Sequence, residues 1–374
     1  MRVLFRADAS IEIGTGHVMR CIALATEWRA QSNIEIVFVC RALEGNLCEL
    51  VEANGFRVIR LPTKNELNQP QANEVGGEYA NWLGVTEEQD AQDMVGCLSV
   101  LSADFVVVDH YGLGEIWGRA ISRFTKCLIV LDDLANRKHY CDVLIDSSPG
   151  RSVSAYEHLV PNQSNCLTGP KFAILRKEFL LMRPTSLNRQ SLSACRHILV
   201  TMGGVDKGNA TNAVLEAIRC SSVPRDTRIT VVLGQNAPWK QNVIEKIRTM
   251  QQRTNLMIDV SNMSELMCQA DLAIGAAGST ALERCCMGLP SIQVVLAENQ
   301  MQSAVALQSL GAALTAEGAE LIEAIRLRLN ELIGNPERIS LMSRRSAEVV
   351  DGLGVTRILD EINARATEKK LWTK

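Results

Sequence analysis

Short apolar runs alternate with segments of helical periodicity along the first half of the chain. The apolar runs are RVLFRAD, EIVFVC, FRVIRL, FVVVDH, CLIVLDD and DVLID, and a helix is expected after the first run, from about His17 to Ala30. Strands that alternate with helices typically form a parallel sheet with helices on both faces. The first half therefore predicts a doubly wound α/β domain.

The same pattern starts afresh in the second half. Its strands are expected at HILVTMGG, RITVVLG, NLMIDV, DLAIGAAG and SIQVVL, with helical stretches between them. The segment KEFLLMRPTSLNRQSLSACR is polar and lacks a clear period, which indicates a linker. We therefore predict two Rossmann-like domains, residues 1–185 and residues 186–374. Residues 62–84 indicate a long loop, and the tail after Gly354 is expected to be helical.

Composition and charge agree with a globular protein and disfavour nucleic-acid-binding, zinc-binding and membrane-spanning proteins. Of the 374 residues, 47% are hydrophobic and 22% are charged, and the net charge of −3 gives no indication of nucleic-acid binding. The twelve cysteines show no CxxC pair and no zinc-site spacing, so we expect reduced thiols in a cytoplasmic protein. No apolar stretch approaches the length of a membrane span.

A small-residue loop in the second half is a candidate phosphate site. In AIGAAGSTALE a strand ends in a loop at Gly278, and Ser279 and Thr280 open a helix. Backbone N–H groups at a helix start favour a negative charge, and small side chains let a phosphate approach. Glu283, on the first turn, could accept hydrogen bonds from a ribose diol. The alternative is an ordinary N-cap serine followed by an acidic first turn.

A second glycine-containing loop precedes the first helix and carries a histidine. The segment GTGH places His17 directly after Gly14 and Gly16. A neutral imidazole beside a glycine-lined space could act as a general base for water, and the alternative is a capping or exposed histidine. The loop lacks the third glycine of a dinucleotide fingerprint, and the chain contains no GxxxxGK[ST] motif. Dehydrogenase and kinase functions are therefore disfavoured.

Polar residues also follow other strands at their carboxyl ends, where open α/β sheets bind ligands. FVVVDHYG ends in Asp109 and Tyr111, which could orient a histidine and bind a sugar or phosphate. LAENQ supplies Asn299 and Gln300, whose amides suit sugar hydroxyl or acetamido groups. Turn formation and a polar helix start are the alternatives.

Taken in order, these motifs resemble one enzyme family over nearly the whole chain. VLFRADASIEIGTGHVMRC, YANWLG, VVDHYGL, LDDLANRKHYCDVLID, GPKFAILRKEF, ILVTMGGVD, GAAGSTALERCCMGLPSI and ENQ resemble the UDP-2,4-diacetamido-2,4,6-trideoxy-β-L-altropyranose hydrolases of pseudaminic acid biosynthesis. The resemblance implies a GT-B-like α/β fold, in which two Rossmann-like domains face a cleft. It also implies a reaction without metal or cofactor, in which water attacks the anomeric carbon and UDP leaves.

The resemblance assigns roles to individual residues. It makes His17 the catalytic base, and it places Tyr111 and Asn299 near the reaction centre. Glu283 matches an acid that binds the uridine ribose, and the loop around Gly278 and Ser279 matches a diphosphate site.

The residue that orients His17 stays open between Asp8 and Asp109, and Arg6 is a candidate to neutralise the pyrophosphate. Other enzymes of the sialic-acid-like sugar pathway are expected as partners, and the product is expected to enter a surface glycan such as that of flagellin. One competing function is a glycosyltransferase of the same architecture, which would need an acceptor. The other is a nucleotide-sugar-binding protein without catalysis, for which His17 would be dispensable.

Overall fold

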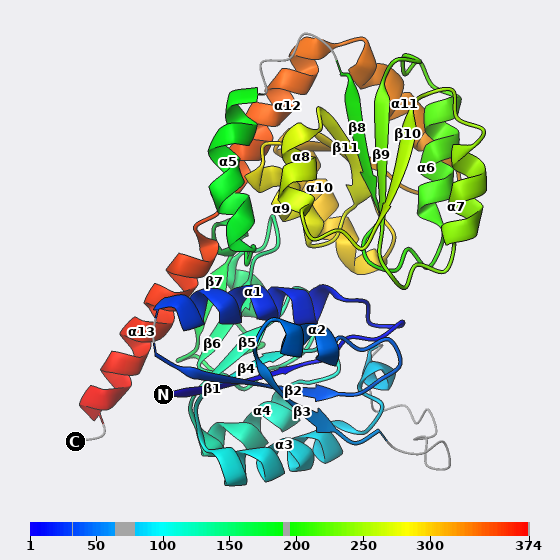
Figure 1. Cartoon of the computed structure of the whole chain (residues 1–374). Helices are drawn as coiled ribbons and strands as arrows, with labels where there is room; N and C mark the ends of the chain where they lie inside the picture. The colour runs from blue at the N-terminus through cyan, green and yellow to red at the C-terminus, as the bar shows by residue number, and fades with distance from the viewer. Residues whose placement is uncertain (32, 64–78, 190–194, 373–374) are drawn as a thin grey trace. The chain divides into compact units, whose positions relative to one another are not determined.

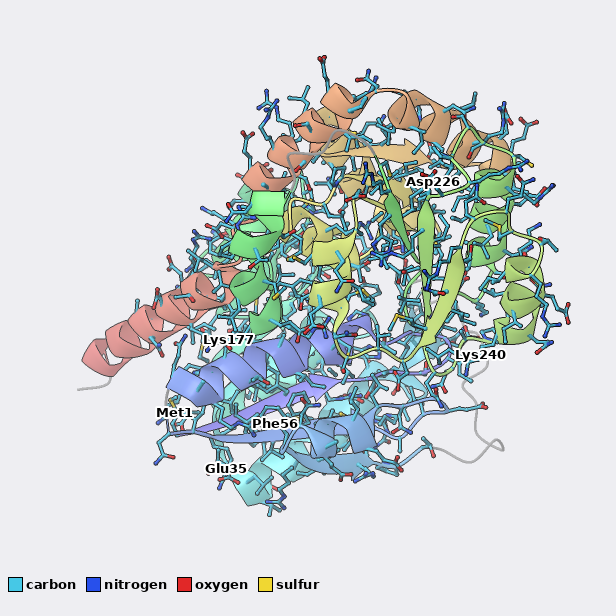
Figure 2. All side chains as sticks on the ribbon, turned by 45° about the horizontal axis from the view of Figure 1, so that its top comes forward. Met1, Glu35, Phe56, Lys177, Asp226 and Lys240 are labelled. Carbon is cyan, nitrogen blue, oxygen red and sulfur yellow. The ribbon has the colours of Figure 1, made fainter. Side chains whose placement is uncertain are left out.

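The computed structural model describes residues 1–31, 33–63, 79–189 and 195–372, and the chain forms two compact units. Unit 1 comprises Met1–Ile174 together with Gly354–Lys374, and unit 2 comprises Leu175–Leu353. No helix in the described part of the chain is long and apolar enough to cross a membrane. Charged side chains such as Glu35, Lys177 and Asp226 are exposed (Figure 2).

Unit 1 contains a seven-stranded parallel sheet in the order β3-β2-β1-β4-β5-β6-β7. Its strands are β1 Arg2–Ala7, β2 Glu35–Arg41, β3 Arg57–Leu61, β4 Ala103–Asp109, β5 Thr125–Leu131, β6 Val143–Asp146 and β7 Asn165–Thr168. β1 and β4 are neighbours, with Ala7 opposite Asp109. The residues that follow these two strands therefore lie at the same edge of the sheet.

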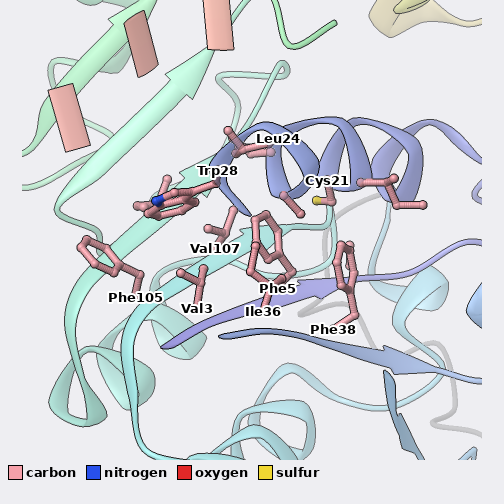
Figure 3. Packing of buried hydrophobic residues seen from close by; sticks show 14 of the residues in the cluster. Val3, Phe5, Cys21, Leu24, Trp28, Ile36, Phe38, Phe105 and Val107 are labelled. Atoms are coloured by element: carbon pink, nitrogen blue, oxygen red, sulfur yellow. The ribbon is translucent and has the colours of Figure 1, made fainter. Parts of the chain in front are cut away.

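The helices of unit 1 cover both faces of its sheet (Figure 1). They are α1 Gly16–Gln31, α2 Cys48–Ala53, α3 Glu87–Leu101, α4 Glu115–Ile121 and α13 Gly354–Trp372. On the α1 face, Phe5 stacks on Phe38 with ring centroids 5.0 Å apart, and Trp28 packs edge-on against Phe105 at 5.2 Å (Figure 3). Aromatic pairs of this kind stabilise a fold by more than the burial of their apolar area alone.

Unit 2 has a six-stranded parallel sheet in the order β10-β9-β8-β11-β12-β13. Its strands are β8 His197–Thr201, β9 Arg228–Leu233, β10 Thr254–Ile258, β11 Leu272–Ala276, β12 Ser291–Val294 and β13 Ala313–Ala316. Its helices are α5 Lys177–Arg189, α6 Ala210–Arg219, α7 Lys240–Ile247, α8 Met263–Gln269, α9 Thr280–Cys286, α10 Met301–Ser309, α11 Leu321–Ile333 and α12 Pro336–Val349.

Most of the described part of the segment predicted as a linker is instead the helix α5, Lys177–Arg189, although Pro184 lies inside it. Proline removes one helical hydrogen bond, so contacts with the rest of unit 2 must compensate for that loss. Arg183 donates to the carbonyls of Ala347 and Val350, each at 2.8 Å, and Ser186 donates to the carbonyl of Met287 at 2.8 Å. These contacts are distant in sequence, which explains why local periodicity did not predict the helix.

The predicted domain limits of 1–185 and 186–374 also need correction. The first unit ends at Ile174, and the tail returns to it as α13. The tail is helical as expected, but its apolar side chains Val355, Ile358, Leu359 and Ile362 join the core of unit 1. Most of the loop predicted over 62–84 lies outside the described residues, and Ala80–Leu83 form a 3-10 turn.

Replacement of Ile358 by alanine tests this assignment of α13. Ile358 is fully buried in the core of unit 1, so the cavity should cost about 2–5 kcal/mol. Hydrogen exchange followed by mass spectrometry should show faster exchange in β1 and α1 and unchanged exchange in β8 and β11. The matched control Ile322→Ala removes a side chain that is 41% exposed and should change little. Faster exchange confined to unit 2 would contradict the assignment.

Candidate active site

A tight turn after β1 places the first turn of α1 beside the end of β4. Gly14 donates its N–H to the Ser10 carbonyl at 2.8 Å and has a φ of +79°, a conformation that favours glycine. The Ser10 hydroxyl accepts from the N–H of Ile13 at 3.0 Å. α1 then begins at Gly16, so that His17 lies on its first turn.

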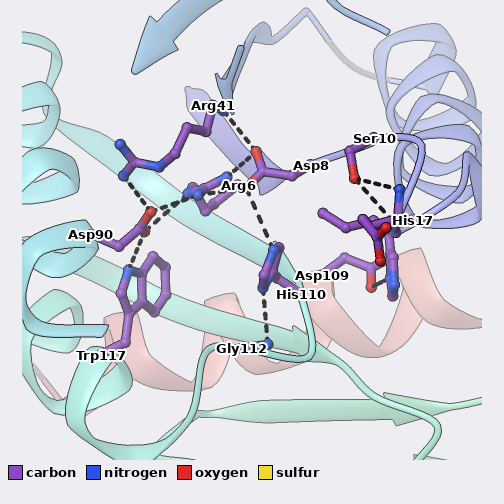
Figure 4. Close-up of polar contacts among 12 residues, drawn as sticks. Arg6, Asp8, Ser10, His17, Arg41, Asp90, Asp109, His110, Gly112 and Trp117 are labelled. Carbon is purple, nitrogen blue, oxygen red and sulfur yellow. Dashed lines mark hydrogen bonds and ion pairs between the residues drawn. The ribbon is translucent and has the colours of Figure 1, made fainter. Parts of the chain in front are cut away.

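His17 contacts the carboxylate of Asp109 at the end of β4 (Figure 4). The distance from His17 Nδ1 to Asp109 Oδ1 is 2.6 Å, and the Asp109 side chain is fully buried. The sequence left the orienting acid open between Asp8 and Asp109, and in the structure Asp109 makes the contact.

Arg20, one turn further along α1, binds the same carboxylate. Its Nη2 donates to Asp109 Oδ1 at 2.6 Å, its Nε donates to Oδ2, and its Nη1 donates to Asp133 Oδ2 at 3.0 Å. Burial opposes ionisation of Asp109, but Arg20 and His17 outweigh it and hold the pKa of that carboxyl well below its usual range. Asp109 is therefore a carboxylate at neutral pH.

The charge on Asp109 determines which nitrogen of His17 carries hydrogen. An ionised carboxylate only accepts hydrogen bonds, so Nδ1 must be the donor in the 2.6 Å contact. In a neutral imidazole Nε2 then carries the lone pair. Arg20 Nη2 lies 3.4 Å from Nδ1, but two donors do not form a hydrogen bond. Among the described residues none forms a hydrogen bond with Nε2, which leaves it able to take a proton.

One ring of a small aromatic cluster packs against this histidine. The ring of Tyr111 lies edge-on to His17, with centroids 4.5 Å apart. Tyr111 in turn stacks on Trp82 at 5.6 Å and packs against Tyr79 at 5.0 Å. Burial, followed by the charge of Asp133, raises the pKa of Tyr111, so its phenol stays neutral. The structure thus brings together three predicted residues, His17, Asp109 and Tyr111.

Arg6 and Asp8 lie in a separate buried network, which corrects the roles predicted for both. Arg6 binds Asp8 at 2.5 and 2.8 Å and Asp90 at 2.6 and 3.0 Å, and all three side chains are fully buried (Figure 4). Asp90 also accepts from Arg41 and Trp117. Arg6 is therefore occupied by carboxylates of its own unit and does not reach a pyrophosphate. Asp8 is held in the same way and does not orient His17.

The predicted phosphate loop of unit 2 lies between β11 and α9. Gly278 and Thr280 are half-buried, Ser279 is exposed, and the Ser279 side chain does not cap the helix. A Cβ added to Gly278 would lie 3.7 Å from Gln300 Nε2, so the loop and the ENQ turn are neighbours. Asn299 is half-buried in that turn, which spans Glu298–Gln300.

Glu283 lies one turn after this loop, with its side chain 15% exposed. Burial raises the pKa of Glu283, while Arg176, whose Nη2 lies 3.6 Å from Oε1, acts in the opposite direction. The carboxyl therefore remains partly accessible beside the loop, as a residue that binds a ligand hydroxyl must be.

Two residues of the candidate site in unit 1 were missed by the sequence analysis: Arg20 and Trp82. Arg20 had a readable signal, because it lies three positions after His17 and so on the same helix face. Trp82 reaches the site from a distant segment, which a single sequence does not connect. Asp133, which binds Arg20, follows β5 next to the end of β4, so its position after a strand was a readable signal. The described residues contain no group of three or more metal-ligating side chains.

Comparisons with known proteins relate this chain to enzymes that act on nucleotide sugars. A model of the glycosyltransferase family 28 C-terminal domain matches residues 197–356. The chain is 30% identical over 263 residues to the spore coat polysaccharide biosynthesis protein SpsG of Bacillus subtilis, covering 68% of this chain and 75% of that protein. It is 23% identical over 311 residues to the UDP-2,4-diacetamido-2,4,6-trideoxy-beta-L-altropyranose hydrolase of Campylobacter jejuni, covering 83% and 97%.

Further similarities concern length and fold. The chain is 28% identical over 306 residues to an uncharacterised protein of Methanocaldococcus jannaschii, covering 81% of this chain but 57% of that protein. Among solved structures, MurG of Acinetobacter baumannii matches with a TM-score of 0.68 at 16% identity, covering 97% of this chain and 99% of that one. The predicted GT-B fold, with two parallel-sheet α/β domains, is thereby confirmed.

Replacement of Arg6 by methionine tests how much the buried network contributes to the free energy of unfolding. The substitution leaves two buried carboxylates without their main partner, which should cost about 3–5 kcal/mol at neutral pH. Burial alone would raise the pKa of Asp90, but Arg6 and Arg41 hold it at about 2. The stability that the Asp90 carboxylate contributes is therefore present above about pH 4 and is lost as pH falls.

Urea denaturation at neutral pH and at about pH 3 should therefore show a smaller difference between variant and wild type in acid. The control is Arg60→Met, which breaks an ion pair between Arg60 and Glu52, whose side chains are 44% and 42% exposed. This variant should lose little stability at either pH. Equal, small losses for both variants would show that the network does not stabilise the unit.

Proposed function

We propose a hydrolytic function for this chain, which belongs to the same family as the Bacillus subtilis spore coat polysaccharide biosynthesis protein SpsG. The proposed substrate is UDP-2,4-diacetamido-2,4,6-trideoxy-β-L-altropyranose, and the products are UDP and the free sugar. Support for this substrate comes from the name of the Campylobacter jejuni relative. The match covers 97% of the length of that relative. The proposed setting is the synthesis of a sialic-acid-like sugar for a surface glycan.

The observation that carries the proposal is the contact between His17 and Asp109. With Nδ1 held by a buried carboxylate, Nε2 takes a proton from water. The water oxygen forms a bond to the anomeric carbon, and the bond from that carbon to the phosphate oxygen breaks with its electron pair. UDP leaves, and the proton rests on His17. A positioned general base of this kind typically contributes about 10²–10⁴-fold.

Unit 2 is proposed to hold the UDP moiety. The small residues of the loop at Gly278 let phosphate oxygens approach backbone N–H groups, which stabilise the leaving diphosphate. Glu283 accepts hydrogen bonds from the ribose diol, and Asn299 and Gln300 contact the substrate from the neighbouring turn. The neutral Tyr111 offers a hydroxyl group near His17 for the sugar.

A glycosyltransferase is the second candidate, and one observation favours it. The family model that matches residues 197–356 is named for glycosyltransferases. The same UDP site would serve either reaction, and the difference lies in whether water or an acceptor hydroxyl attacks. A transferase would release UDP only when an acceptor is present.

Replacement of His17 by asparagine tests the proposal. Purified protein in EDTA and without acceptor should release UDP from the diacetamido sugar nucleotide but not from UDP-N-acetylglucosamine. His17→Asn should lower this rate about 10²–10⁴-fold because the base is lost, while UDP binding stays unchanged. In H₂¹⁸O the label should enter the sugar and not UDP. His158→Asn changes an exposed histidine and is the matched control.

Three results would contradict different parts of the proposal. Release of UDP that begins only when an acceptor is added would replace hydrolysis by transfer. Label in UDP would place the attack at phosphorus. Full activity of His17→Asn, with the control equally active, would remove His17 from the mechanism.

A further inference from the structure

Arg284 is a fully buried arginine beneath the loop that joins β11 to α9. It lies four residues after Thr280 on the same helix face, and helical side chains lean toward the N-terminus. Its Nη2 donates to the carbonyl of Ala276 at 2.9 Å, and its Nη1 lies 3.4 Å from the hydroxyl of Thr280. The guanidinium therefore reaches back under residues 276–280.

No carboxylate forms an ion pair with Arg284, although the charge of Glu283, which lies farther away, favours its ionised form. Among the described residues, no aspartate or glutamate oxygen lies within 4 Å of it, and its Nε has no hydrogen-bond partner. The other fully buried arginines, Arg6 and Arg41, are each paired with carboxylates. Burial lowers the pKa of Arg284 to about 10, so the side chain is still charged at neutral pH. An unpaired buried charge is costly and calls for a counter-ion.

The loop backbone is built closely around this guanidinium. A Cβ added to Gly275 would lie 2.5 Å from Arg284 Nη1 and 3.0 Å from the Thr201 carbonyl, so a larger residue there would require the guanidinium to shift. The structure thus reserves space in β11 for the arginine, directly before the loop. A buried cation that is accommodated at this cost to the packing is expected to have a partner.

Helix α6, which follows the strand β8 beside β11, shows a different arrangement. Asp206 of the same chain accepts hydrogen bonds from the N–H groups of Ala210 at 2.8 Å and Thr211 at 3.0 Å. The chain therefore supplies its own carboxylate to the start of α6. At α9 no side chain caps the helix, and Glu283 in its first turn forms no ion pair with Arg284.

We infer that Arg284 is a positioning residue for a nucleoside diphosphate, whose negative charge is the counter-ion that Arg284 lacks in the chain. This inference rests on the proposed function, in which the loop at Gly278 holds a diphosphate. Arg284 acts through the loop: it fixes the Ala276 carbonyl from below and adds positive potential where the phosphates bind. A burial that is costly in the free protein is offset when the anion is bound.

The test compares Arg284→Met and Arg284→Lys with the wild type. Titration calorimetry measures binding of UDP, uridine and inorganic pyrophosphate, and thermal unfolding is followed with and without each ligand. Arg284→Met should weaken UDP and pyrophosphate binding about tenfold or more, with uridine binding unchanged. Arg284→Lys should retain most of the affinity. The unfolding temperature of ligand-free Arg284→Met should not fall, because methionine removes an unpaired buried charge.

The outcomes separate this inference from the function on which it rests. If the wild type binds UDP and Arg284→Met binds it equally well, the inference fails and the proposed UDP site stands. Equal weakening of UDP and uridine, with a lower unfolding temperature, would make Arg284 a structural residue and also overturn the inference. If pyrophosphate binds in an Arg284-dependent manner and UDP binds no better, the anion site stands and the nucleotide assignment fails. Failure of the wild type to bind either ligand overturns both.

Discussion

The buried carboxylate of Asp109 is the constraint on which the candidate active site depends. A charge at the end of β4 requires partners, and α1 supplies two of them, His17 and Arg20. The neighbouring positions of β1 and β4 bring the start of α1 to that carboxylate. Because Arg20 keeps Asp109 ionised, Asp109 accepts from Nδ1 of His17 and leaves Nε2 to receive a proton. Electrostatics thus determine the orientation of the proposed base.

Buried charges have different partners in the two units. This difference distinguishes a network that stabilises the fold from a site proposed to bind a ligand. In unit 1, Arg6, Asp8, Asp90 and Arg41 satisfy one another at the carboxyl ends of β1 and β2. In this network each arginine is paired with carboxylates of the chain, without a ligand. In unit 2, Arg284 lies under a loop of small residues and forms no ion pair with a carboxylate of the described residues. An incomplete buried interaction is more often a sign of a binding site than a complete one.

Much of the fold could be predicted from the sequence because buried parallel strands are continuous apolar runs. The strands β7 (NCLT) and β13 (ALTA) were missed because they lack a continuous run of large apolar residues, whereas β6 and β12, which are equally short, were predicted. The helix α5 and the docking of α13 depend on contacts distant in sequence. His17, Asp109 and Tyr111 could be predicted because each directly follows a strand or opens a helix. The true position of Arg6 could not, since an arginine in a strand has the same pattern whether it meets a carboxylate or a ligand.

The most direct test is the tautomer of His17, measured by ¹⁵N NMR of histidine-labelled protein at neutral pH, with Asp109→Asn for comparison. The account predicts that Nδ1 of His17 carries the hydrogen and that Nε2 gives the resonance of an unprotonated ring nitrogen. In Asp109→Asn this preference should weaken. A wild-type protein in which Nε2 carries the hydrogen would contradict the account, because Nε2 could then not take a proton from water.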